Sequence, residues 1–103
     1  MEEELEEWPP PEARVRSAVW RAEGHLERRE YAAASRALAD VFGLRQCDRD
    51  LLHGLHHLAA AGYKAGDGDL VRARRQLAHA RRRLGAFPDV APLIELVERD
   101  VGS

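Results

Sequence analysis

Hydrophobic side chains recur along most of the chain at intervals of three and four residues, which is the spacing of one face of an α-helix. The pattern predicts five helices, over about residues 12–28, 30–42, 49–65, 70–84 and 90–101. No run of β-branched residues alternates with polar ones, and Ile94 is the only isoleucine, so no strand is predicted. The fold class expected is therefore all-α.

Residues that favour helix ends lie between the predicted helices. Gly43 is expected to end the second helix in a left-handed conformation. The sequence Gly66-Asp67-Gly68-Asp69 predicts a turn, with positive φ at its glycines. Three aspartates are expected to be N-caps: Asp48, Asp69 and Asp89.

The two halves of the chain share a weak repeat with an offset of 38 to 39 residues. Ala22-x-Gly24 is echoed by Ala60-x-Gly62, and the apolar positions of the second predicted helix by those of the fourth, Tyr31, Ala34 and Leu38 against Leu70, Ala73 and Leu77. Short connections favour antiparallel helix pairs. We therefore expect two stacked helical hairpins in the manner of tetratricopeptide repeats, with a short C-terminal helix as a cap.

Three apolar residues among those expected to face inward are Tyr63 in the central helix, Leu70 in the fourth and Leu96 in the last. Gly54 and Ala61 lie beside the apolar arc of the central helix and are expected to admit a neighbouring backbone closely.

Length and composition indicate one domain, residues 12–103, preceded by an acidic arm, residues 1–11, that ends in three prolines. The net charge is −2, and the acidic N-terminus is unlike a secretory or organellar signal. Cys47 is the only cysteine, so an intrachain disulfide and a Cys-based metal cluster are excluded. No apolar run approaches the roughly 20 residues of a membrane span. A cytoplasmic protein without membrane association is expected.

The stretch from Trp20 to Leu84 resembles a family of small helical bacterial and archaeal proteins catalogued as domain of unknown function 309. The resemblance rests on Tyr31 at the start of a helix, on Leu52-His53-Gly54-Leu55 continuing into Ala59-Ala60-Ala61, and on a Gly-rich turn before an Ala/Leu/Arg helix. It implies an all-helical fold with this helix order. The acidic and histidine positions of the family are replaced here by Ala33, Ser35, Arg36 and Ala39, so no polar site is carried over.

Histidines supply the first candidate for chemistry. His53 and His57 are four residues apart on one predicted helical face, the spacing at which two imidazoles can share a metal ion. A third ligand would have to come from His25, His79 or Asp50. A metal-dependent or small-ligand-binding protein that uses this face is one alternative, although ordinary surface histidines are the commoner case. No other cofactor and no catalytic residue is predicted.

Arginines supply the second candidate for a functional site. The helix predicted over residues 70–84 carries a basic face made of Arg72, Arg74, Arg75, Arg81, Arg82 and Arg83. Such a row can neutralise phosphates, so nucleic-acid binding is another alternative. The negative net charge and the lack of aromatic residues among the arginines argue against it.

Trp8 and Trp20 fall off the predicted apolar faces and are candidates for contact with a partner. Because no catalytic constellation accompanies the hairpin pattern, the function expected is a non-enzymatic protein-interaction module, which binds another protein or a second copy of itself as a homodimer.

Overall fold

The fold is all-α, as the sequence predicts. The computed structural model describes residues 9–44 and 48–102, and in this part of the chain there is no strand. The elements in chain order are the helices α2 (Pro11–Glu27), α3 (Tyr31–Ala39), α4 (Arg49–Gly66) and α5 (Leu70–Leu84), then a 3₁₀ turn η1 (Pro88–Val90) and α6 (Ala91–Val101). The acidic segment 1–8 and Cys47 lie outside the described residues.

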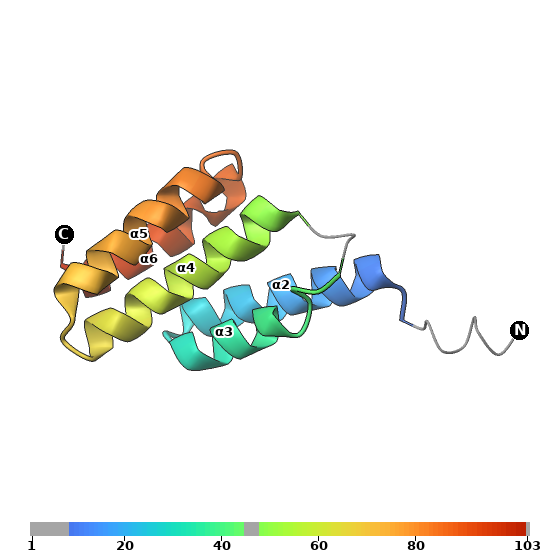
Figure 1. Ribbon diagram of the computed structural model, residues 1–103, viewed down its shortest axis with the longest axis horizontal. Helices are drawn as coiled ribbons and strands as arrows, with labels where there is room; N and C mark the ends of the chain where they lie inside the picture. Colours follow the sequence, from blue (N-terminus) through green and yellow to red (C-terminus); the bar gives the residue numbers. More distant parts are fainter. Residues whose placement is uncertain (1–8, 45–47, 103) are drawn as a thin grey trace, which may run out of the picture.

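Two antiparallel hairpins, α2/α3 and α4/α5, build the molecule, and α6 packs against α4 and α5. In Figure 1 the long helix α4 lies between the α2/α3 pair and the α5/α6 pair. This position explains why α4 is so poor in charge, since neighbours cover more than one of its faces.

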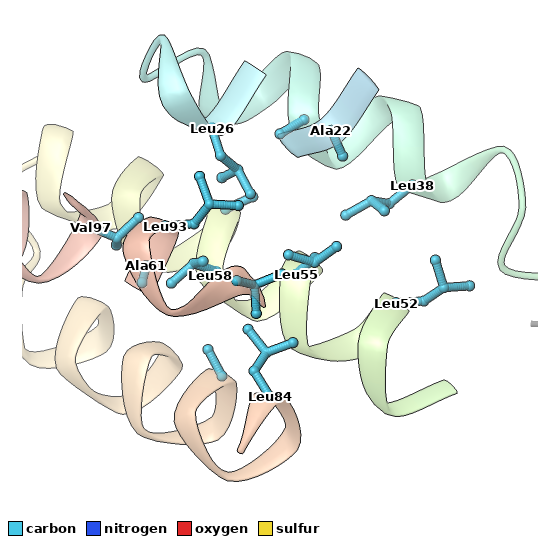
Figure 2. Packing of buried hydrophobic residues seen from close by; sticks show 14 of the residues in the cluster. Ala22, Leu26, Leu38, Leu52, Leu55, Leu58, Ala61, Leu84, Leu93 and Val97 are labelled. Atoms are coloured by element: carbon cyan, nitrogen blue, oxygen red, sulfur yellow. The ribbon is translucent and has the colours of Figure 1, made fainter. Parts of the chain in front are cut away.

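One core joins all five helices. Figure 2 shows Ala22, Leu26 and Leu38 of the first hairpin above Leu55 and Leu58 of α4. Leu84 approaches α4 from α5, and Leu93 and Val97 come from α6. All of these side chains are buried. Their burial from water is the main force that holds the helices together.

Capping residues set several boundaries. The Asp48 carboxylate accepts hydrogen bonds from the backbone N–H groups of Asp50 and Leu51, and Asp69 accepts one from Arg72. Two of the three predicted N-caps, Asp48 and Asp69, are thus confirmed. The predicted bounds of 70–84 are those of α5, and 12–28 differs from those of α2 by one residue at each end.

Two predicted helix ends are wrong. The second helix ends at Ala39 rather than at residue 42, because the chain turns over residues 40–43, and Gly43 does not have a positive φ. The last helix starts with the 3₁₀ turn η1, and its N-cap is Val90, not Asp89.

The two hairpins turn in the same way. The backbone N–H of Arg29 donates to Leu26 O at 3.0 Å and that of Glu30 to His25 O at 2.8 Å. These two bonds form a Schellman motif. The same two bonds recur 39 residues later, from Gly68 to Ala65 O at 3.0 Å and from Asp69 to Lys64 O at 2.9 Å. The structure therefore places the repeat at an offset of 39 between the hairpins, within the predicted 38 to 39.

Three apolar residues expected to face inward do not. Tyr63 is 51% exposed and Leu70 is 39% exposed, because both lie where the α4/α5 hairpin turns and no helix of the described chain covers them. Leu96 is only half buried. Gly54 and Ala61 are buried, but what lies close to Gly54 is the Leu84 side chain of α5 rather than the neighbouring backbone that was predicted. No helix among the described residues has the length and apolarity needed to cross a membrane.

Candidate functional site

A groove with a mainly apolar lining runs between α3 and α4. Its volume is about 370 Å³. We call it the α3/α4 groove, and it is lined by Tyr31, Ala32, Ser35, Arg36, His56, Ala59, Ala60, Tyr63 and Lys64. Alanines at its centre keep the two helices from filling the space between them, while Tyr63 stands exposed at its side.

The charged side chains of the α3/α4 groove are both cationic. Arg36 comes from α3 and Lys64 from α4, and no carboxylate lines the groove, although the chain has 18 acidic and 16 basic residues. Within the described part of the chain, neither cation forms an ion pair. Burial lowers the pKa of His56, with help from His57 and His53, so its ring favours the neutral form. The groove is therefore an apolar surface bordered by positive charge.

One end of the groove is fixed by a polar contact between the first hairpin and the last helix. Arg29 Nε donates to both carboxylate oxygens of Asp100, at 3.0 and 2.9 Å, and the Tyr31 hydroxyl donates to the same carboxylate. Burial, followed by the Asp100 carboxylate, raises the pKa of Tyr31, which keeps its hydroxyl protonated. Arg29 has a left-handed backbone, with φ at 59°. The contact holds Tyr31 in place as one wall of the groove.

This contact was not predicted. Arg29 and Asp100 are 71 residues apart, and neither belongs to a recognisable motif. The groove was not predicted from the sequence either, because its alanines indicate only that the segments form helices. The one available signal was Tyr31 at the start of a helix, opposite the small residues that follow Leu58.

The histidines predicted as metal ligands face different partners. His53 stacks on Phe42, with ring centroids 5.1 Å apart, and His56 meets the edge of the same ring at 5.3 Å. His57 Nδ1 donates to Gln76 Oε1 of α5 at 2.7 Å, and its ring lies 5.1 Å from that of His79.

A metal site on the His53/His57 face gains no support from this arrangement. Three residues were candidates for the third metal ligand. One of them, His79, does approach His57, but Arg82 donates to the Nδ1 atom of His79 at 2.6 Å. His25 lies instead beside Glu30, and Asp50 beside Arg83. Among the described residues, no three His, Cys, Asp or Glu side chains are grouped so that they could hold a metal ion.

The basic face of α5 is exposed as expected, but three of its six arginines pair with carboxylates within the fold. Arg72 pairs with Asp69 at 3.5 Å, Arg83 with Asp50 at 3.2 Å, and Arg81 with Glu98 of α6. The other three are Arg74, Arg75 and Arg82. Paired guanidinium groups are less available to phosphates, which weakens the case for nucleic acid.

Trp20 is 75% exposed, on the side of α2 opposite its buried residues, as the sequence predicts for a side chain off the apolar face. In the repeat of 39 residues its counterpart is Ala59, which is buried beside α3. Trp20 therefore lies on the face of α2 that corresponds to the face of α4 covered by α3, and on α2 this face is exposed. Trp8 lies outside the described residues, so its contact with a partner stays a prediction.

No family model, no curated protein and no solved structure matches the chain. The resemblance to the family of unknown function thus stays a prediction, and the function has to be inferred from the surface of the molecule.

Proposed function

We propose that this chain is a non-enzymatic protein-interaction module, and that it binds an acidic, partly apolar segment of another protein in the α3/α4 groove. The observation that carries the proposal is the pairing of an alanine-lined groove with two cations and no carboxylate. The segment belongs to a different protein or to a second copy of this chain, and a selection of random peptides tests both cases.

The shape of the groove suits a polypeptide. It lies between two helices, and the small side chains of Ala32, Ala59 and Ala60 allow a third backbone to come close. Peptide-binding domains commonly hold a helix or an extended segment in such a groove, with apolar anchors in the floor. The exposed ring of Tyr63 adds the kind of large, rigid surface that contributes most in protein interfaces.

The charges select the partner. Arg36 and Lys64 lie on opposite walls and face solvent or the groove without an acidic partner among the described residues. A segment with Asp or Glu on both sides of an apolar anchor would pair with both cations. Charge of this kind raises the rate of association and excludes basic segments.

A selection of random peptides displayed on phage tests the proposal. Against the wild-type chain we expect enrichment of sequences with Asp or Glu flanking Leu, Phe or Trp. The double variant Arg36→Glu, Lys64→Glu should lose this enrichment. The matched control is Arg74→Glu, Arg75→Glu, which makes the same change of charge on the exposed face of α5 and should keep it.

Circular dichroism of all three proteins shows whether they fold alike. No enrichment with the wild type, or enrichment that survives in the groove variant but not in the control, would overturn the proposal.

A further inference from the structure

The helix α6 occupies the position in a third repeat that α4 occupies in the second. The buried residues Val90 of η1 and Leu93 and Val97 of α6 follow Leu52, Leu55 and Ala59 of α4 at a constant distance of 38 residues. Like α4, α6 directly follows the second helix of a hairpin and packs against it. The described chain therefore contains two hairpins and the first helix of another.

In α4 a second face is covered by the other helix of its hairpin. Gly54 lies against Leu84 of α5, and His57 bonds to Gln76 of α5. The residues of α6 that correspond to Gly54, His57 and Leu58 are Pro92, Glu95 and Leu96. The first two are exposed and the third is half buried. No helix of the described residues covers this face of α6.

A hollow of about 660 Å³ lies on this uncovered face, between α6 and α2. We call it the α2/α6 groove, and it is lined by Glu23, Glu27, Asp89, Pro92, Leu93, Glu95, Leu96 and Arg99. Four carboxylates and one arginine give it a net negative charge. Burial, together with the nearby Glu27 and Asp89, raises the pKa of Glu23, so a cation placed there would relieve repulsion.

We infer that the α2/α6 groove docks an amphipathic helix of a partner protein, with Arg or Lys beside its apolar stripe. The repeat indicates a helix, because a helix covers the equivalent face of α4. The carboxylates indicate its charge. The helix α5 shows the required pattern within this chain, since Ala73, Leu77 and Leu84 are buried and arginines occupy much of the remaining surface. This inference is independent of the α3/α4 groove.

A synthetic peptide that copies residues 69–85 is a suitable probe, because it carries the side chains that pack on α4. Its binding to the intact chain can be followed by fluorescence anisotropy with an N-terminal dye. We expect Leu96→Asp and Glu95→Lys each to weaken binding by about ten-fold or more, as for central interface residues. Added salt should weaken it further.

Two control variants make the same changes elsewhere and should bind as the wild type does. Val71→Asp alters an apolar residue that is 69% exposed on α5, and Glu12→Lys reverses a charge in the first turn of α2. A peptide of the same composition with its apolar stripe scrambled should not bind.

Equal binding by the wild type and Leu96→Asp would show that the peptide binds elsewhere, for example by replacing α5, and would overturn the inference. Absence of binding by the wild type would also overturn the inference, and α6 would then be only the C-terminal cap of the repeats.

Discussion

At the scale of single residues, two glycines set how closely the helices approach α4. A Cβ atom added to Gly54 would lie 2.5 Å from the Leu84 side chain, and one added to Gly62 would meet the ring of Tyr31. Both glycines are buried, and each faces a different helix. The wall of the α3/α4 groove thus depends on a missing side chain at Gly62 as much as on the side chains that are present.

The replacement Gly54→Ala should destabilise the protein by about 1 to 3 kcal/mol, because the new methyl group would force Leu84 or α5 to move. Gly66→Ala is the matched control in the same helix, since nothing lies within 4 Å of a Cβ there. It should be neutral or slightly stabilising, because alanine favours helix. Urea unfolding measures both. Equal effects of the two replacements would contradict this packing.

Local signals predicted residues well where the cause is local. Asp48 and Asp69 cap helices through hydrogen bonds to residues two or three positions away, so their roles can be predicted from the neighbouring residues alone. The burial of Tyr63 was predicted wrongly because periodicity identifies a face but not whether a neighbour reaches it. The pairing of Arg29 with Asp100 depends on the whole fold, and no local pattern contains it.

At the scale of elements, the fold prefers the neutral form of three imidazole rings, those of His53 and His56 on α4 and of His79 on α5. Burial, followed by Arg83, lowers the pKa of His53. The pKa of His79 on α5 is lowered by burial and then by Arg82, in the same direction as that of His56. The three rings lie close to one another or to arginines, so each added proton would meet other positive charge.

The folded protein should therefore lose stability as the pH falls. An unfolded histidine titrates near 6.5, whereas these folded histidines take up protons at lower pH, so the unfolded chain binds more protons between the two values. Stability should be full above about pH 6.5 and fall as the pH drops through the folded pKa values. Glu23, with its raised pKa, acts in the opposite direction.

Melting temperatures of the wild type and His56→Gln between pH 7.5 and about pH 5 test this, since glutamine does not titrate. The variant should show a smaller decrease than the wild type. Parallel curves for the two proteins would contradict the assigned direction of the His56 pKa.

The order and number of the helices could be predicted from the sequence, but the residues at which the helices end were predicted less well. The bounds of α5 were predicted correctly because Asp69 begins it and Gly85 follows it. The second helix was predicted too long because Val41 and Phe42 keep the apolar spacing after the backbone has turned, and Val41 is in fact buried. Spacing alone does not distinguish a helix from a compact turn that fills the same place.

At the scale of the whole molecule, the repeat yields two surfaces of opposite charge. The α3/α4 groove lies within the stack and has cationic walls, while the α2/α6 groove lies where the stack is left open and is acidic. The repeat itself was visible in the sequence, as the spacing of Leu38 and Leu77. The grooves were not, because each combines residues from helices that are distant in sequence, and the partner of α6 is inferred only once its position in the repeat is known.

The most direct measurement of the central claim is a charge exchange in the α3/α4 groove. The affinity of an acidic peptide from the selection is measured by isothermal titration calorimetry for the wild type, Lys64→Glu and the control Arg74→Glu. Lys64→Glu should weaken binding by about ten-fold or more, and a peptide with Lys in place of the facing acid should recover it. The control should bind as the wild type does. Unchanged affinity in Lys64→Glu, or equal weakening in Arg74→Glu, would contradict the assignment of the α3/α4 groove as the binding site.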